Sequence, residues 1–414
     1  MALVKTLAHY LAGRPSQPLA SVERLATFTL FLIVAFSFNI LPPNFSYDGR
    51  LASGADGTPF NQIFWVAALL CSLYCLVNMP ARARAAFLPA LPLCALCVLL
   101  LVSALWSLAP LITVRRAGLE MIVVACVVIN VMALQRAEQA FHILYRVAAL
   151  TLAFDLCMLL RANGYDEAGL FRGIHTHKNV TGYLGATSIL TGLWLRRAGA
   201  GLGRGANMAF LAGWALVLGM SQSKTSIALT LAAPLLAYGL RRLAQASGAG
   251  LGMLLAGLGG LAYSAAALAY LSGVDLPGGV ERFVHHVGFT GRDDIWDFLL
   301  ARATERPWLG YGYGGFWDIG PDSPSVRWGS GFLPMINQAH NGYLDLFLAL
   351  GVVGVAAWAG VLIGYVVCLA RIEAAASMPW LSGLCWTLVV FSLLHNLTES
   401  SLLRGFVWVW LLQL

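Results

Sequence analysis

The residues best suited to chemistry are six cations and one histidine that lie near the ends of apolar segments. The cations are Arg115, Arg116, Arg172, Lys178, Lys224 and Arg292, and the histidine is His340. Arginine offers a planar fork of donors and lysine a point charge, and together they suit phosphate oxygens. An imidazole can accept a proton near neutral pH, so His340 could act as a general base. Two alternatives stay open: the cations could anchor helices to lipid headgroups, and His340 could cap or pack a helix start.

Three nearby acids, Asp293, Asp294 and Asp297, form a DDxxD pattern that could hold magnesium on a diphosphate. Acids in the first turn of a helix are also favoured by the helix dipole, and Arg292 beside them could neutralise a phosphate without a metal. No second acidic cluster follows in the sequence. We therefore predict no metal at this pattern.

The histidine pairs and the cysteines do not predict a metal or redox site either. The pairs His175/His177 and His285/His286 have no acid or cysteine at ligand spacing. The Cys94-x-x-Cys97 pair lacks a second pair, and all eight cysteines lie in apolar stretches, which is typical of small buried hydrophobes without a disulfide. No cofactor is predicted.

Membrane-spanning helices must position these residues, because 59% of the chain is hydrophobic and only 11% is charged. A soluble surface needs about a quarter of its residues charged, so a soluble enzyme is excluded. One crossing takes about 20 apolar residues, and the chain holds enough for about twelve. The predicted spans are 25–42, 60–79, 87–105, 117–134, 141–160, 179–195, 205–221, 225–240, 251–272, 342–370, 379–397 and 399–414. The fold class is an all-α polytopic membrane protein.

The distribution of charge predicts the orientation of the chain. With the N-terminus inside, Lys and Arg concentrate in the inner segments, and the outer segments are close to neutral, as the positive-inside rule requires. The net charge of +7 is thus spread between spans, and we expect no nucleic-acid partner. All six candidate cations fall on the outer side, where short loops ordinarily avoid them. Their presence there favours an anionic ligand, and a lipid diphosphate is the natural candidate.

The chain divides into nine spans over residues 1–272, an outer loop over 273–339 and three spans over 340–414. A loop of about 67 residues is usually functional. The sequence Thr290-Gly-Arg-Asp293 resembles a capping box, and it predicts an amphipathic helix that reaches Pro307 and could lie on the membrane surface. Its apolar positions are Ile295, Trp296, Leu299, Leu300 and Ala303. The run Gly310–Gly315 lacks the Lys-Ser/Thr of a P-loop, so we interpret it as turns.

Several charged residues lie in or beside the predicted spans: Glu120, Asp155, Asp345, Glu399 and Arg404. Intramembrane charges are typical of transporters, and Glu120, Asp155 and Arg146 make a flippase or transporter of lipid-linked sugars an alternative function. Transporters commonly show paired repeats and broken helices, and this sequence shows neither. Glu399 is expected to pair with an outer cation.

Seven motifs in order resemble the O-antigen ligase and polymerase family of bacterial inner membranes over about residues 100–400. They are Trp106-Ser-Leu-Ala-Pro110 with Arg115-Arg116, Gly169-Leu-Phe171, His177-Lys-Asn179, Gln222-Ser-Lys-Thr225, Gly291-Arg292 with Ile295-Trp296, Pro307-Trp-Leu-Gly-Tyr-Gly312, and His340-Asn-Gly-Tyr-Leu344 leading to Gly351. The resemblance implies a C-type membrane glycosyltransferase with a large periplasmic loop over its active site. It would act without metal or ATP.

The resemblance also implies substrates and roles. An O-antigen glycan would move from undecaprenyl diphosphate to lipid A-core, with His340 as the general base and with Arg292 and Lys224 on the diphosphate. The family usually has arginine at the position of Lys224, which keeps the charge but loses the bidentate fork. Arg115, Arg116, Arg172 and Lys178 are further diphosphate candidates. An O-antigen polymerase and a protein O-oligosaccharyltransferase are alternatives within the family. The expected location is the bacterial inner membrane, among its lipids, with the active site facing the periplasm.

Overall fold

The computed structural model describes residues 17–41, 59–79, 90–199, 203–247, 292–374 and 379–414. Within these ranges the chain is helical, and the only bridge between extended residues joins Tyr165 and Phe171. The helices are α2 (Gln17–Ser37), α3 (Pro59–Asn78), α5 (Leu91–Val102), α6 (Pro110–Ala133), α7 (Glu138–Met158), α8 (Lys178–Arg197), α9 (Arg204–Ser221), α10 (Lys224–Ser247), α13 (Asp293–Ala303), α14 (Pro324–Trp328), α15 (Gly342–Ala374), α16 (Pro379–His395) and α17 (Trp408–Leu411). The prediction of an all-α chain is confirmed for these residues.

Six of the described helices are long and apolar enough to cross a membrane: α2, α3, α6, α7, α10 and α15. Two more, Leu91–Leu105 and α16, are apolar but shorter. An apolar helix of this length satisfies its own backbone hydrogen bonds in hydrocarbon, which is why helices are the form such sequences take. The structure therefore supports a polytopic membrane protein.

The described residues account for only part of the twelve expected spans. The segments 179–195 and 205–221 are helices, α8 and α9, but neither is apolar enough to stand among the six spans. The segment 251–272 lies outside the described residues. The prediction of a span at 399–414 is wrong, because residues 399–407 are not helical and α17 has only four residues. Glu399, Arg404 and Gly405 interrupt this apolar run with polar and backbone contacts to the rest of the chain.

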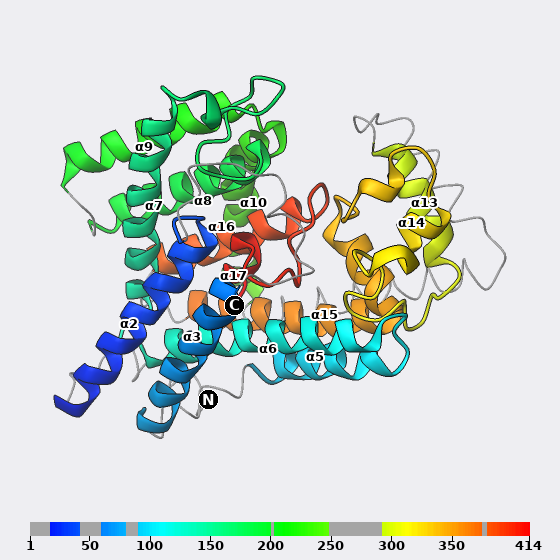
Figure 1. The fold of residues 1–414 in the computed structure, drawn as a ribbon. Helices are drawn as coiled ribbons and strands as arrows, with labels where there is room; N and C mark the ends of the chain where they lie inside the picture. The colour runs from blue at the N-terminus through cyan, green and yellow to red at the C-terminus, as the bar shows by residue number, and fades with distance from the viewer. Residues whose placement is uncertain (1–16, 42–58, 80–89, 200–202, 248–291, 375–378) are drawn as a thin grey trace.

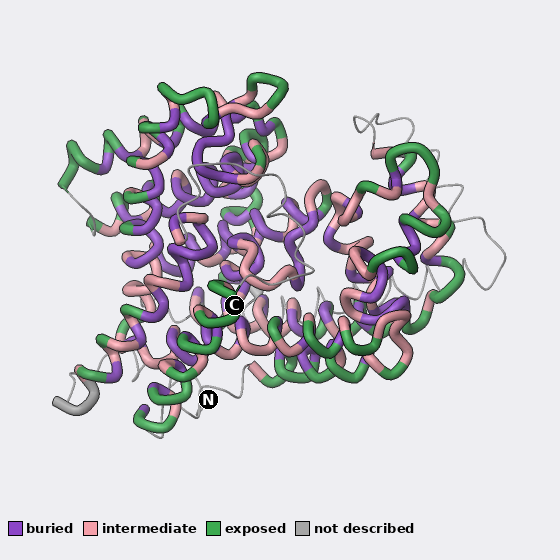
Figure 2. The backbone as a smooth tube through the Cα atoms, viewed as in Figure 1, coloured by how far each residue is buried: buried purple, intermediate pink, exposed green. Residues whose placement is uncertain are grey.

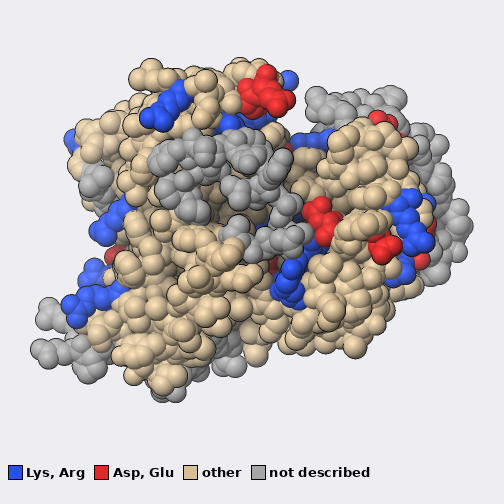
Figure 3. Space-filling view, viewed as in Figure 1, with Lys and Arg blue, Asp and Glu red and all other residues tan. Residues whose placement is uncertain are grey.

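The helices form a bundle from which the segment 292–339 extends as a separate lobe (Figure 1). Helices α5, α6 and α15 run together toward this lobe, and the C-terminal segment before α17 lies between the lobe and the bundle. Buried positions concentrate at the centre of the bundle (Figure 2). On the face drawn in Figure 3, broad areas carry no Lys, Arg, Asp or Glu, as expected for helices that contact lipid.

The described part of the long loop has its own apolar core. Helix α13 buries Ile295, Trp296, Leu299 and Ala303, whereas Leu300 is only partly buried. These side chains pack with Tyr311, Phe316, Trp317, Leu333, Ala339 and Leu348. The predicted apolar face is thus correct, but it faces the loop core and not a membrane surface. The helix ends at Ala303, four residues before Pro307, and Thr290 of the expected capping box lies outside the described residues.

A kink in α15 docks the loop onto the bundle. Gly351 has φ 61° and ψ −157°, which breaks the helical backbone and frees the amide of Val352 for the carbonyl of Pro307, 2.9 Å away. A Cβ at Gly351 would lie 2.3 Å from the backbone of Trp308. The indole of Trp106 donates to the carbonyl of Leu309 at 2.8 Å. Three of the family-like motifs therefore meet here, around Trp106, Pro307 and Gly351, and build the base of the lobe.

The cysteines do not follow one pattern of burial. All eight are free, and Cys75, Cys97 and Cys126 are buried. The expectation that every cysteine is buried is wrong, because Cys94 and Cys157 are exposed on the outer surfaces of α5 and α7. In a lipid-facing helix an exposed thiol still lies in an apolar environment. A cysteine on such a surface and a buried cysteine therefore lie in equally apolar stretches of sequence, and the sequence does not distinguish them.

Candidate active site

The backbone that carries His340 is fixed from both sides. The amide of Ala339 donates to Asp345 Oδ1 at 3.1 Å, and its carbonyl accepts the indole of Trp296 at 2.8 Å. His340 itself has φ 49°, a left-handed conformation that is uncommon for a residue with a side chain. Such a conformation persists only where the surroundings determine it, and it is a recurrent feature of functional sites. The position of the imidazole is therefore defined by its neighbours.

The turn after His340 is bound to the segment that follows α16. The amide of Gly342 donates to the carbonyls of Asn396 and Glu399 at 2.9 and 3.2 Å, and the amide of Asn341 donates to Ser400 Oγ at 3.1 Å. The side chain of Asn341 then caps the start of α15 by accepting from the amides of Tyr343 and Leu344, both at 3.1 Å. These bonds bring two segments 59 residues apart into register, so His340 and Glu399 face each other.

Glu399 is the centre of the polar cluster. Its Oε2 lies 3.3 Å from His340 Nδ1, and its Oε1 accepts from Arg292 Nη2 at 2.8 Å and from Asn179 Nδ2 at 2.7 Å. Arg292 donates a further bond to the carbonyl of Thr398. The side chains are 28% exposed for His340, 18% for Arg292 and 13% for Glu399. The expected pairing of Glu399 with an outer cation is confirmed, and the histidine and one predicted cation share this carboxylate.

The electrostatics of the cluster favour an ionised Glu399. Burial by itself would raise the pKa of this carboxyl, but the hydrogen bond with His340 and the charge of Arg292 outweigh it and hold the pKa below its usual range. Glu399 is therefore a carboxylate at neutral pH. A carboxylate can only accept hydrogen bonds, which constrains the groups that face it.

The first turn of α8 contributes the next cations. His177 caps the helix by accepting the amide of Asn179 at 3.2 Å, and Lys178 is the first helical residue, adjacent to the asparagine that binds Glu399. Gly182 packs on Ser223 and Ser226, where a Cβ would come within 2.4 Å of Ser223 Cβ. This contact places Lys224, the exposed first residue of α10, beside the start of α8. Two helix N-termini that each begin with a lysine thus lie close together, and that of α8 reaches the cluster through Asn179. Helix N-termini attract anions.

The other three predicted cations differ in what they contact. Arg116 donates to the carbonyls of Gly314, Trp317 and Asp318 in the long loop. Arg172 is 7% exposed and donates to the carbonyl of Asn163. Arg115 is exposed on α6. Arg116 and Arg172 therefore hold loops in place, and the structure does not bring Arg115 or Arg116 into contact with His340 or Arg292.

The other charged residues identified in the sequence also have hydrogen-bond or ion-pair partners. Glu120 is buried in α6 and accepts from Trp410 Nε1, the amide of Gly405 and the hydroxyl of Tyr313. Asp155 lies 3.2 Å from His175, a pairing across 20 residues that the spacing did not predict. Asp345 accepts from Trp317 and lies 4.0 Å from Arg404. These groups fix helices and loops to one another.

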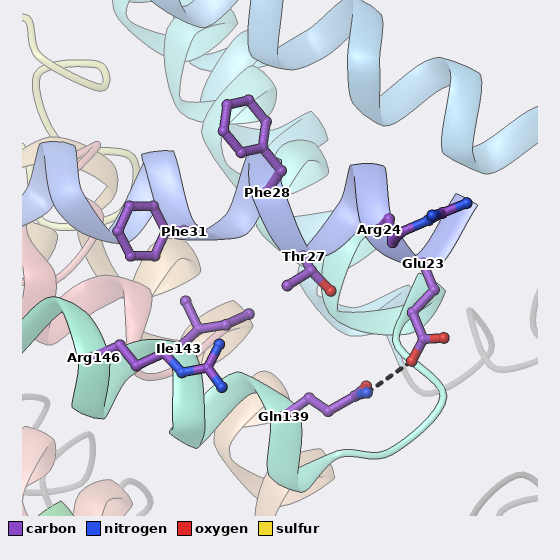
Figure 4. Close-up of a pocket in the computed structure, with 8 residues that line it drawn as sticks. All are labelled: Glu23, Arg24, Thr27, Phe28, Phe31, Gln139, Ile143 and Arg146. Atoms are coloured by element: carbon purple, nitrogen blue, oxygen red, sulfur yellow. Dashed lines mark hydrogen bonds between the residues drawn. The ribbon is translucent and has the colours of Figure 1, made fainter. Parts of the chain in front are cut away.

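Within the described ranges, no group of three or more His, Cys, Asp or Glu side chains is arranged to hold a metal ion. Asp294 of the DDxxD pattern is exposed on α13, and His285 and His286 lie outside those ranges. A cavity between α2 and α7 is lined by Glu23, Arg24, Thr27, Phe28, Phe31, Gln139, Ile143 and Arg146 (Figure 4). It contains none of the predicted site residues.

Two residues of the cluster were not among the predicted site residues. Asn179 belongs to the His177-Lys-Asn179 motif, so the motif itself was the signal that could have identified it. Glu399 stood out only as an acid between two apolar segments. Its contact with Arg292 spans 107 residues, and no spacing rule predicts a pairing over that distance.

Comparison with known proteins gives a family match for part of this chain. Residues 208–359 match a family model described as O-antigen ligase. This range contains Lys224, Arg292 and His340, together with Gly351 and the Pro307–Gly312 motif. The comparison with curated proteins gives no match.

Proposed function

We propose, on the premise that this chain belongs to the O-antigen ligase/polymerase family, that it transfers a glycan from a lipid diphosphate to an acceptor hydroxyl. Members of this family are glycosyltransferase-like enzymes of glycan assembly. The finer proposal is an O-antigen ligase with undecaprenyl-diphosphate-linked O-antigen as donor and lipid A-core as acceptor. Its location would be the inner membrane, with the active site facing the periplasm.

The observation that carries the proposal is the cluster around Glu399, which brings His340 and Arg292 together. A glycosyl transfer from a diphosphate needs a base for the acceptor proton and cations for the leaving group. His340 could supply the first, and Arg292 with Lys178 and Lys224 could supply the second. His340 and Arg292 contact one carboxylate, Lys178 precedes the asparagine that binds the same carboxylate, and Lys224 begins α10, which packs on α8.

The reaction is a single displacement at the anomeric carbon. His340 accepts the proton of the acceptor hydroxyl while its oxygen forms the new bond to the anomeric carbon. The bond from that carbon to the diphosphate oxygen breaks, and the lipid diphosphate leaves with the electron pair. The configuration is inverted, and the cations stabilise the charge that grows on the leaving oxygen. No redox step and no further co-reactant are needed.

The lobe supports a transfer over a hydrolysis. Its apolar core, built on Trp296, Leu299 and Trp317, covers the backbone of Ala339 next to His340. A cover of this kind limits the access of water to an activated donor, and hydrolysis would waste that donor. A transporter would require a ligand path, and two of the three charged groups that suggested one, Glu120 and Asp155, are engaged in contacts between segments. The third, Arg146, lines the cavity between α2 and α7.

The ligase is tested by offering three acceptors to the purified protein in liposomes. A labelled undecaprenyl-diphosphate-linked glycan is supplied with lipid A-core, with a second lipid-linked glycan, or with an acceptor protein. The ligase predicts label on lipid A-core. Label on the second lipid-linked glycan would instead make the protein a polymerase, and label on the acceptor protein would make it a protein O-oligosaccharyltransferase.

A matched pair of variants ties the result to the site. Arg292→Ala should remove most of the transfer, whereas Arg327→Ala, an exposed arginine on α14, should leave it unchanged. Donor flipping without transfer in the wild-type protein would contradict the proposal and favour a transporter.

A further inference from the structure

We propose that Glu399 is the positioning residue of this active site, which holds His340 in the tautomer that leaves Nε2 free to take the acceptor proton. This inference rests on the proposed function and adds to it a residue that acts through His340 and Arg292. The role follows from the hydrogen bonds of the Glu399 carboxylate, whose two oxygens have different partners, and from the position of the proton on the imidazole.

The geometry divides the two oxygens of Glu399 between two tasks. Oε2 faces His340 Nδ1 at 3.3 Å, and Oε1 accepts from Arg292 at 2.8 Å and from Asn179 at 2.7 Å. The backbone carbonyl of Glu399 also accepts the amide of Gly342, two residues after His340. Both the side chain and the main chain of Glu399 therefore bind the segment that carries the base.

The charge of Glu399 then determines which imidazole nitrogen carries the proton. An ionised carboxylate has no proton to donate, so a hydrogen bond between Oε2 and Nδ1 requires the hydrogen on Nδ1. In the neutral ring this leaves the lone pair on Nε2, the nitrogen that points away from Glu399. When Nε2 takes the acceptor proton, the carboxylate stabilises the imidazolium that forms, as an acidic partner does in a catalytic triad.

No other acid among the described residues can fill this role. Asp345 accepts from Trp317 and from the amide of Ala339, and Glu120 accepts from Trp410 and Gly405. The charged and titratable groups around Glu399 come from four segments: His177 and Tyr183 at α8, Arg292 at α13, His340 before α15 and His395 at the end of α16. Glu399 is the one carboxylate among them.

Because His340 and Arg292 share Glu399, replacing this residue should have opposite effects on kcat and on donor binding. Removing the negative charge takes away the partner of the imidazolium, so kcat should fall. The same change removes an anion that competes with the diphosphate for Arg292, so the donor should bind at least as tightly. A residue with only a structural role would weaken both together.

The test compares Glu399→Gln with Glu305→Gln in the full-length protein reconstituted in liposomes. Glu305 is a matched control, because it also pairs with an arginine, Arg302, at 2.6 Å, but lies in the lobe, where its other partner is Tyr311 and not a residue of the cluster. For Glu399→Gln we expect kcat to fall about 10²-fold, in the range of general-base contributions, with the donor KM unchanged or lower. The acidic limb of the pH–rate profile should move to lower pH, because a neutral amide no longer favours the protonated ring. Glu305→Gln should keep the wild-type kcat and profile.

A second variant and a spectroscopic measurement decide the case if Glu399→Gln does not fold. Glu399→Asp keeps the charge and should retain the wild-type acidic limb while losing part of kcat. In wild-type protein with ¹⁵N-labelled histidine, the signal that His340→Ala removes should show the proton on Nδ1. A proton on Nε2 at neutral pH would overturn the inference.

The outcomes also separate this inference from the proposed function. If His340→Ala abolishes transfer while Glu399→Gln keeps the wild-type kcat and pH profile, the positioning role fails and the proposed function stands. If the wild-type protein transfers label to none of the acceptors, the proposed function itself fails, and if His340→Ala retains normal transfer, the role of His340 as the base fails. A parallel loss of kcat and donor affinity in Glu399→Gln would show a structural role and would also overturn the inference.

Discussion

At the scale of single residues, the structure separates six cations that look alike in the sequence. Arg292 shares a carboxylate with His340, and Lys178 and Lys224 begin two packed helices, whereas Arg116 and Arg172 donate to loop carbonyls. The sequence predicts their sign and side of the membrane, because both follow from local composition. The sequence cannot predict which cations are available to a ligand and which hold loops in place, because the carbonyls that Arg116 binds lie about 200 residues away.

This division predicts different consequences for two alanine substitutions. Lys224→Ala should raise the donor KM and leave Tm near that of the wild-type protein, because the side chain is exposed. Lys224→Arg, which keeps the charge and adds a bidentate fork, should keep full activity or improve donor binding. Arg116→Ala should lower Tm, since each lost hydrogen bond from a charged donor is worth about 1.5–3 kcal/mol. Thermal unfolding in detergent and donor titrations measure both, and a stable Arg116→Ala with a raised KM would reverse the assignment.

The lowered pKa of Glu399 predicts how stability depends on pH. A carboxyl whose folded pKa lies below its ordinary value of 4.5 stabilises the fold above that pH and loses this contribution as the pH falls through the folded pKa. The Tm of the wild-type protein should therefore exceed that of Glu399→Gln at neutral pH, and the difference should shrink below about pH 4.5. A Tm difference that stays constant down to acid pH would contradict the ionised state assigned to Glu399.

At the scale of elements, apolar length predicted most helices and failed where polar contacts interrupt it. Helices α2, α3, α6, α7, α10 and α15 follow from apolar runs alone. The run 399–414 is as apolar in composition, but Glu399 and Gly405 bind Arg292 and Glu120 in distant segments, and the chain folds as a turn. Periodicity gave the buried face of α13 correctly, but it could not show whether a membrane or the loop core covers that face.

The kink at Gly351 gives a prediction for the element that supports the lobe. Gly351→Ala forces a side chain into positive φ and places a Cβ against the backbone of Trp308, so it should lower Tm. Positive φ alone costs about 1–3 kcal/mol for a residue other than glycine. Gly360→Ala, on the same helix with no atom within 4 Å of its added Cβ, is the matched control and should change Tm little. Equal Tm values for the two variants would show that the kink is not needed.

At the scale of the whole molecule, one end of the bundle carries the lobe and the polar cluster. Figure 1 shows the segment 292–339 beyond the ends of α5, α6 and α15. The charge distribution of the sequence predicts that this end faces the periplasm. The family match over residues 208–359 covers Lys224, Arg292 and His340, but not Lys178 or Glu399, and it does not define the orientation.

The orientation can be tested by the accessibility of single introduced cysteines. Asp322→Cys in the lobe and Arg136→Cys between α6 and α7 are both exposed positions, and the predicted topology puts them on opposite sides. A membrane-impermeant maleimide should label Asp322→Cys in spheroplasts and Arg136→Cys only in everted vesicles, with the unmodified protein as the background control. The reverse pattern would place the site on the cytoplasmic side.

The most direct measurement for the account as a whole is the single-turnover rate of glycan transfer by His340→Ala, with donor binding measured on the same preparation. The protein should bind the lipid-linked donor as the wild type does, because Arg292 and the two lysines remain. Its transfer rate should fall about 10²–10⁴-fold, while His142→Ala on α7 keeps the wild-type rate. Transfer by His340→Ala at the wild-type rate would contradict the central claim that this imidazole deprotonates the acceptor.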